Sequence, residues 1–257
     1  MAAAKARGSD MESPPGTRTG PRIAWVTGAA GGIGRAVCES WVESGGVAVA
    51  TDVRSCESWP GVIGMACDVR SESSVRAVVA ECERQGGLDV LVNAAGIMRR
   101  ADVLEMGAEE WSEVFDVNLR GAYLCSQGAA RSMIARARGG SIVHIGSVNA
   151  EKVFGDSVAY CSSKGALHAL GRSMALGLAS HRIRVNIVAP GAIHDTDLEP
   201  QRWAREEERS GMTGRTPLRS LGTSADVAAV VMFLASDAAR FITGATIFVD
   251  GGRTATV

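Results

Sequence analysis

The sequence predicts an α/β fold, with one doubly wound parallel sheet of about seven strands flanked by helices. Short apolar runs alternate with longer helical patterns from residue 22 to the C-terminal end. The runs are nearly continuous, which is typical of strands buried on both faces of a parallel sheet. Strand–helix alternation of this kind indicates a doubly wound arrangement. No repeat or linker divides the chain, so we expect one domain over residues 21–257.

The elements follow from the pattern in chain order. Strands are predicted at residues 22–27, 47–52, 61–67, 88–94, 140–146, 183–189 and 245–250. Helices are predicted between them at residues 32–45, 71–87, 108–137, 158–180 and 224–237, and the third is long enough to be kinked. Thr223 and Asp226 have the spacing of a capping box at the start of the last helix, with Asp in place of Glu.

Composition narrows the class of partner. The 257 residues are 46% hydrophobic and 21% charged, with a net charge of −1, which suits a globular domain. The charge balance gives no reason to expect nucleic acid or an anionic membrane as a partner. No apolar run reaches the roughly 18 residues of a membrane helix. Residues 1–20 are small, polar and rich in Pro and Gly, without the apolar core of a secretory signal, and predict a flexible tail.

The cysteines indicate the cell compartment. No pair has CxxC spacing, so the sequence predicts no metal site and no thioredoxin-like motif. Scattered thiols fit a reducing cytoplasm. The six are Cys38, Cys56, Cys67, Cys82, Cys125 and Cys161.

Ser147, Tyr160 and Lys164 predict a site for proton transfer. Tyr160 and Lys164 are four residues apart, so on a helix they share one face. An ammonium beside a phenol lowers the pKa of the phenol, which makes the tyrosine a usable proton acceptor near neutral pH. The Ser147 hydroxyl would hold a substrate oxygen at the same point. The alternative is a pair of surface neighbours, but the chain has only 2 tyrosines and mostly uses Arg for positive charge.

A glycine loop, "VTGAAGGIG" (26–34), follows the first strand and opens the first helix. Gly28, Gly32 and Gly34 leave room for a tight turn and for close approach of a pyrophosphate to the helix N-terminus. The spacing is G-x-x-x-G-x-G rather than G-x-G-x-x-G. Its place between strand and helix predicts a Rossmann-like nucleotide site.

Asp52 ends the second strand and indicates NAD as the cofactor. An acid at this point can accept hydrogen bonds from the ribose hydroxyls and would repel a 2′-phosphate. A turn residue is the plainer interpretation of Asp52. Arg54, two residues on, could instead receive that phosphate, which leaves NADP open.

Several further motifs stand in a fixed order: "NAAG" (93–96), Asn118 in "DVNLRGA", "YCSSK" (160–164), "APGAI" (189–193) and "FITGATIFVDGG" (241–252). Together with the glycine loop and Ser147 they resemble the short-chain dehydrogenase/reductase family over residues 22–252. The resemblance implies a catalytic set of Asn118, Ser147, Tyr160 and Lys164, with Asn118 in a water-linked proton relay. It also implies a homotetramer paired through the helices near 108–137 and 158–180 and near the C-terminus.

The same resemblance implies the cofactor contacts. Asp68 and Val69 would meet the adenine, Asn93 would steady the central strand, and Ile193 would offer its backbone to the nicotinamide carboxamide. The remaining matched positions are Ile33, Ala94, Gly96, Pro190 and Gly191, together with Tyr160 and Lys164. Two positions depart from the family pattern: Ala94 stands where Asn is usual, and the threonine after "PG" comes late, as Thr196.

One subgroup looks closest, the 2,3-dihydro-2,3-dihydroxybenzoate dehydrogenases of siderophore biosynthesis. The similar features are "NAAGIMR" (93–99), the short connection from Asp52 to Asp68, and "DTDLEPQRW" (195–203). A cyclic dihydrodiol carboxylate needs a cation in its pocket. Arg99 and Lys152 are the candidates, each with a solvated surface charge as the alternative, and His194 is a third candidate contact.

These features predict an NAD-dependent dehydrogenase of a secondary alcohol, with a dihydrodiol carboxylate or the related dihydro-hydroxyanthranilate as substrate. A 3-oxoacyl-thioester reductase or a sugar or keto-acid dehydrogenase of the same family is the alternative. A non-catalytic nucleotide-binding scaffold is disfavoured because the proton-transfer set is complete. Residues 194–222 are polar and strongly charged, and predict a mobile lid over cofactor and substrate.

Overall fold

The computed structural model describes residues 20–198 and 200–256. The predicted tail, residues 1–20, lies outside this part of the chain except for Gly20. One sheet of seven strands organises the molecule, in the order β3-β2-β1-β4-β5-β6-β7. All neighbouring strands are parallel. The predicted fold class and all seven predicted strands are therefore confirmed. The strands are β1 (Ile23–Thr27), β2 (Val47–Asp52), β3 (Val62–Ala66), β4 (Leu88–Asn93), β5 (Gly140–Ile145), β6 (Ile183–Pro190) and β7 (Thr246–Val249).

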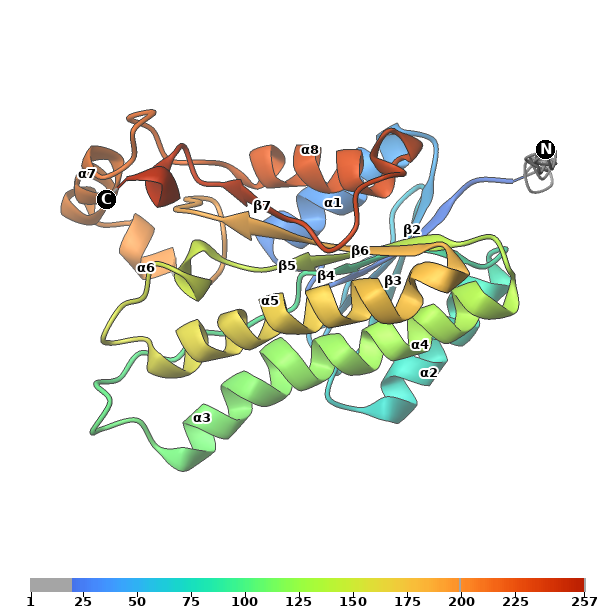
Figure 1. Ribbon diagram of the computed structural model, residues 1–257, viewed down its shortest axis with the longest axis horizontal. Coiled ribbons are helices and arrows are strands. Elements are labelled where there is room, and N and C mark those ends of the chain that lie inside the picture. The colour runs from blue at the N-terminus through green and yellow to red at the C-terminus, as the bar shows by residue number, and fades with distance from the viewer. Residues whose placement is uncertain (1–19, 199, 257) are drawn as a thin grey trace, which may run out of the picture.

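Helices cover both faces of the sheet, as Figure 1 shows. One face is covered by α1 (Gly32–Glu43) and α8 (Ser224–Ala235). The other is covered by α2 (Glu72–Arg84), α3 (Ala108–Phe115), α4 (Ala122–Ala135) and α5 (Val158–Leu178). Each face has its own apolar core, and the interior strand β1 contributes to both because all five of its residues are buried. Burial on both faces explains the continuous apolar pattern of the strands.

The long helix predicted at 108–137 is interrupted rather than continuous. A π-helical segment, Asp116–Gly121, separates α3 from α4. A π-helical turn admits an extra residue and often marks a functional site. Asn118 lies within this π-helical segment.

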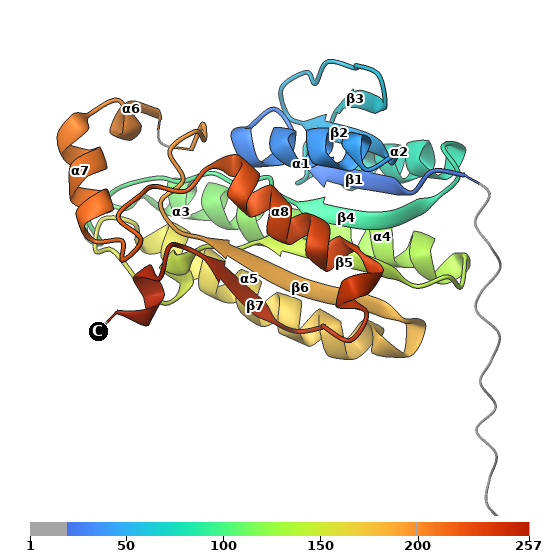
Figure 2. The ribbon, with the colours of Figure 1, turned by 90° about the horizontal axis from the view of Figure 1, so that it is seen from above.

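Two short helices, α6 (Pro200–Trp203) and α7 (Glu206–Gly214), lie at the end of the sheet to which the strand arrows point (Figures 1 and 2). The C-terminal turn after β7 lies at the same end. In a doubly wound sheet, ligands bind at the carboxyl ends of the strands. In the part of the chain that the structure describes, no helix is both long and apolar enough to cross a membrane.

Candidate active site

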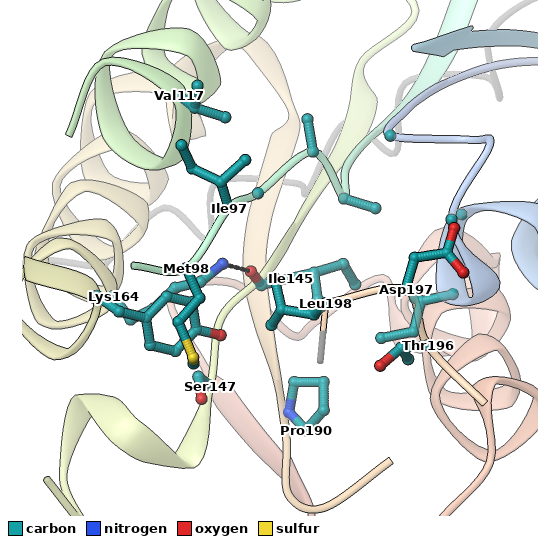
Figure 3. Close-up of a pocket in the computed structure, with 18 of the residues that line it drawn as sticks. Ile97, Met98, Val117, Ile145, Ser147, Lys164, Pro190, Thr196, Asp197 and Leu198 are labelled. Carbon is teal, nitrogen blue, oxygen red and sulfur yellow. Dashed lines mark hydrogen bonds between the residues drawn. The ribbon is translucent and has the colours of Figure 1, made fainter. Parts of the chain in front are cut away.

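Ser147, Tyr160 and Lys164 come together at the carboxyl end of the sheet. Ser147 follows β5 by two residues, and the other two lie on the first two turns of α5. All three side chains are buried, with Tyr160 only 5% exposed. Figure 3 shows Ser147 and Lys164 on the same side of a cavity. The four-residue spacing of Tyr160 and Lys164 therefore places both residues on one face of α5, as predicted.

The amine of Lys164 is held by the backbone of the strand. Its Nζ donates to the Ile145 carbonyl at 2.8 Å, the dashed line in Figure 3, and lies 5.6 Å from the centroid of the Tyr160 ring. Burial lowers the pKa of Lys164 from 10.5 to about 8, because desolvation disfavours the ammonium. The ammonium still dominates at neutral pH, where its charge favours the phenolate of a neighbouring tyrosine.

Asn118 connects the segment after β4 to helix α5. Its Oδ1 accepts from the Ile97 N–H at 2.8 Å, and its Nδ2 donates to the Ile97 carbonyl at 2.9 Å. The same Nδ2 donates to Ser163 Oγ at 3.0 Å, one residue before Lys164. Asn118 therefore lies beside the proton-transfer residues without lining the cavity itself. Its part in a proton relay remains a prediction.

The glycine loop presents bare backbone to the cavity. Gly28 has φ of 65°, and a Cβ there would lie 2.6 Å from the Ala95 nitrogen, so this turn requires glycine. A Cβ on Gly31 would meet nothing closer than 3.4 Å, so it would project into the cavity. No side chain caps the N-terminus of α1. This open cradle fits the pyrophosphate of a dinucleotide.

Asp52 lies beside that loop at the end of β2. Its Oδ2 accepts from the Ala30 N–H at 3.3 Å. Its Oδ1 accepts from the Arg54 N–H at 3.0 Å and from Arg54 Nε at 3.2 Å. Arg54 also reaches Asp197 at 3.4 Å. The acid that predicts NAD and the arginine that could receive a 2′-phosphate are therefore in direct contact.

One cavity of about 510 Å³ joins these features. Every residue predicted to contact the cofactor lines it except Asn93. Asn93 instead donates to Ser126 Oγ at 2.9 Å and lies 3.2 Å from His144 Nδ1, which ties β4 to α4 and β5. At the adenine end, Asp68 pairs with Arg70 at 2.8 Å, and this contact lowers the pKa of Asp68. The residues present thus fit a dinucleotide along the carboxyl edge of the sheet.

The predicted lid contributes to the same cavity. Thr196, Asp197, Leu198, Trp203 and Met212 line it, and Figure 3 shows Thr196 and Asp197 on the side away from Ser147. The Thr196 hydroxyl donates to the Ile193 carbonyl at 3.4 Å. The predicted lid region therefore forms part of the cavity wall. Its movement remains a prediction.

The two predicted substrate cations, Arg99 and Lys152, and the third candidate contact, His194, lie in different environments. Arg99 lines the cavity but forms an ion pair with Glu113, at 3.0 Å. Lys152 is not part of the cavity wall, and its Nζ donates to the Thr256 carbonyl at 2.7 Å. His194 is also outside the wall, with Nδ1 3.0 Å from the Gly222 carbonyl. The structure thus brings only Arg99 of this group to the cavity.

Arg253 lines the cavity and was not among the sequence-based candidates. Its guanidinium lies 5.4 Å from the centroid of the Phe154 ring, and its Nη1 lies 3.8 Å from the sulfur of Met212. The available signal was the "DGGR" turn after the last strand. A position far along the chain gives no indication that this turn folds back on the loop after Ser147.

The comparisons with known proteins find related enzymes over most of the chain. Residues 28–254 match the family model described as enoyl-(acyl carrier protein) reductase. An L-rhamnose 1-dehydrogenase (NAD(P)(+)) of Azotobacter vinelandii is 36% identical, over 88% of this chain and 94% of its own length. The 3-oxoacyl-[acyl-carrier-protein] reductase MabA of Mycobacterium tuberculosis is 38% identical, over 90% of this chain and 92% of its own.

A solved structure is similarly close. The gluconate 5-dehydrogenase of Burkholderia cenocepacia, in complex with NADP and tartrate, superposes with a TM-score of 0.85 and 31% identity. The match covers 93% of this chain and 98% of that one. With the fold, the glycine cradle and the Ser–Tyr–Lys geometry, these matches show that the chain belongs to the short-chain dehydrogenase/reductase family of nicotinamide-dependent oxidoreductases.

Proposed function

We propose that this protein is an NAD-dependent dehydrogenase that interconverts a secondary alcohol and a carbonyl on a sugar or a small keto acid. The observation that carries the proposal is one cavity that joins the glycine cradle and Asp52 to the buried Ser147, Tyr160 and Lys164. A nucleotide and a hydroxyl substrate can therefore meet at the proton-transfer residues.

The chain's own residues would handle the proton. The Lys164 ammonium favours the Tyr160 phenolate, which accepts the hydroxyl proton of the substrate. The Ser147 hydroxyl holds the same oxygen and so fixes its distance from the phenol. The nicotinamide, when bound against Gly96 and Ile193, supplies the hydride acceptor. Reduction of a carbonyl uses the same residues in the opposite direction.

Asp52 supports NAD as the preferred cofactor. Its carboxylate is held beside the glycine loop by the Ala30 and Arg54 N–H groups, so its charge stays where a 2′-phosphate would have to lie. Arg54 is bonded to this same carboxylate and to Asp197. It would have to leave both before it could bind a phosphate.

The relatives support the sugar and keto-acid alternative better than the dihydrodiol carboxylate. Those compared include an L-rhamnose dehydrogenase and a gluconate dehydrogenase, each named for a sugar or sugar acid. The siderophore pathway, the homotetramer and the cytoplasmic location remain predictions from the sequence.

A 3-oxoacyl-thioester reductase is the second candidate. A relative with that name is 38% identical over 90% of this chain. The cavity also has an apolar wall at Met98, Leu198 and Trp203 that would suit an acyl chain. A substrate panel therefore has to contain both classes.

One experiment tests the proposal and the mechanism together. Nicotinamide absorbance at 340 nm would follow aldoses, aldonates, dihydrodiol carboxylates and 3-hydroxyacyl thioesters, each with NAD and NADP. We expect turnover of a sugar or hydroxy acid with NAD preferred, and a fall in kcat of about 10²–10⁴-fold in Tyr160→Phe. NADH binding should persist in this variant. Turnover confined to thioesters, or undiminished turnover in Tyr160→Phe, would contradict the proposal.

A further inference from the structure

Arg54 joins two carboxylates that come from different segments of the cavity wall. Its Nε donates to Asp52 Oδ1 at 3.2 Å, and its Nη2 donates to Asp197 Oδ2 at 3.4 Å. Asp52 ends β2, whereas Asp197 belongs to the lid region, 143 residues after Arg54 in the chain. All three residues line the cavity. The guanidinium is therefore shared between the sheet and the lid region.

The two acids hold this guanidinium in different ways. Asp52 is only 9% exposed, and the Ala30 and Arg54 N–H groups keep its carboxylate in place. Asp197 is 60% exposed and forms the longer of the two contacts. The hydrogen bond and charge of Asp52, and less strongly those of Asp197, raise the pKa of Arg54. Asp52 is thus the fixed partner, and Asp197 is the partner that a movement of the lid region would remove.

The contact with Asp197 lies close to the glycine cradle along the chain and in space. Asp195, two residues earlier, packs directly on the cradle, because a Cβ on Gly32 would lie 2.2 Å from the Asp195 carbonyl oxygen. The start of the lid region is therefore fixed beside the loop that fits a pyrophosphate. A dinucleotide bound there would bring its adenosine ribose to the end of β2, beside Asp52 and Arg54.

The charges at this point favour a ribose over a 2′-phosphate. Two carboxylates and one guanidinium leave one net negative charge, which repels a phosphate. A ribose hydroxyl can donate to Asp52 while Arg54 keeps both of its partners. A phosphate is best bound by the fork of N–H groups at the end of an arginine, and Asp197 occupies one of these groups. Without the Asp197 charge, Arg54 and Asp52 would form a neutral pair whose outer edge can turn to a phosphate.

We propose that Asp197 is a specificity-determining residue for the cofactor: it holds the outer edge of Arg54 and so disfavours NADP. The inference rests on the proposed function, because it refines the cofactor preference of that same site. The preference is then set by two acids, one at the end of β2 and one in the lid region. Arg54 transmits the effect of the second acid.

Calorimetric titration with NADH and NADPH tests this role without any turnover. The two nucleotides differ only in the 2′-phosphate. In Asp197→Asn, the dissociation constant of NADPH should fall about 2- to 5-fold, the range for an exposed ion pair, and that of NADH should change less than about 1.5-fold. Glu207→Gln removes an equal charge from α7 outside the cavity wall and is the matched control. It should leave both constants within about 1.5-fold of the wild-type values.

A double-mutant cycle then shows whether Asp197 acts through Arg54. Most of the gain in NADPH affinity should disappear when Asp197→Asn is combined with Arg54→Met, because the guanidinium that would bind the phosphate is gone. An unchanged NADPH affinity in Asp197→Asn, or the same gain with and without Arg54, would overturn the inference. Failure of the proposed function has a different signature: no alcohol in the panel is oxidised, or the wild-type protein binds NADPH more tightly than NADH.

Discussion

At the scale of single residues, Gly146 shows how closely the site is packed. It separates Ile145, whose carbonyl holds Lys164, from Ser147. A Cβ on Gly146 would lie 2.3 Å from Nε2 of His168 and 2.7 Å from Cγ2 of Ile187. The His168 ring therefore occupies the space that any side chain at 146 would need, and it positions the end of β5.

Gly146→Ala should accordingly disturb both the fold and the chemistry. We expect a loss of about 1–3 kcal/mol in the free energy of unfolding, the usual cost of overpacking a core. A fall in kcat should accompany it, because the Ile145 carbonyl and Ser147 move together. Urea denaturation and steady-state kinetics measure the two effects.

The double variant Gly146→Ala/His168→Ala provides the control. Removing the ring frees the space on one side, so part of the stability and of kcat should return, with a coupling of at least about 0.5 kcal/mol. Recovery stays partial because Ile187 remains in place. Strictly additive losses would show that His168 does not restrict residue 146.

Residue type and local spacing were sufficient to find Tyr160, Lys164 and Asp52, because each acts beside a motif that is continuous in sequence. Arg253 could not be found in this way. It lines the cavity beside Phe154 and Met212, which are 99 and 41 residues away in the chain. Lys152 was predicted to contact substrate because it is near Ser147 in the sequence. In the structure its amine instead donates to the Thr256 carbonyl in the C-terminal segment.

At the scale of elements, the start of α8 connects the lid region to the core. Thr223 and Asp226 form the predicted capping box, with the Asp226 N–H 3.2 Å from Thr223 Oγ1 and the Thr223 N–H 2.8 Å from Asp226 Oδ2. The next residue, Ser224, donates its N–H and its hydroxyl to Asp195 Oδ1. One helix terminus thus fixes both α8 and the first residues of the lid.

Thr223→Ala should lower the free energy of unfolding by about 1 kcal/mol, because the Asp226 N–H loses its acceptor. Thr223→Ser keeps the hydroxyl and should recover most of this loss. Thermal unfolding of the three proteins measures the difference. A serine variant as unstable as the alanine variant would show that the methyl group, and not the cap, stabilises the helix.

The π-helical segment marks a limit of sequence-based prediction at this scale. Residues 108–137 keep a helical pattern throughout, so one long helix was the natural expectation. The extra residue in the turn is stabilised by the Asn118 amide, which bonds across to Ile97 and Ser163. Such a bulge depends on hydrogen-bond partners outside the helix. The hydrophobic periodicity of residues 108–137 therefore gives no sign of it.

At the scale of the whole molecule, two buried histidines link stability to pH. His144 on β5 and His168 on α5 are both almost fully buried. Burial, with a smaller contribution from the nearby Lys164, lowers the pKa of His144 from 6.5 to about 3 and that of His168 from 6.5 to about 4. His168 also lowers the pKa of His144, and Arg172 lowers the pKa of His168. Both histidines are therefore neutral in the folded protein.

The lowered pKa values of the two histidines make the folded protein less stable at acidic pH. Between about pH 4 and 6.5 the unfolded chain binds these protons and the folded chain does not, so the folded state loses stability as the pH falls. Within this window, each histidine should lower the free energy of unfolding by about 1.4 kcal/mol for each pH unit of acidification. Denaturation midpoints across pH 4.5–7 should show a shallower slope in His144→Asn or His168→Asn. The exposed His181→Asn serves as the control, and an unchanged slope in both buried variants would contradict this assignment.

The division of the cavity wall along the chain has a consequence for protein engineering. The glycine cradle and Asp52 come before residue 97, whereas Phe154, Met212 and Arg253 come from three later connections beyond the ends of the strands. These three connections could be exchanged with those of a relative while the cradle, Ser147, Tyr160 and Lys164 stay in place. Segment grafting at the three connections is therefore a direct route to altered substrate preference with the redox chemistry retained.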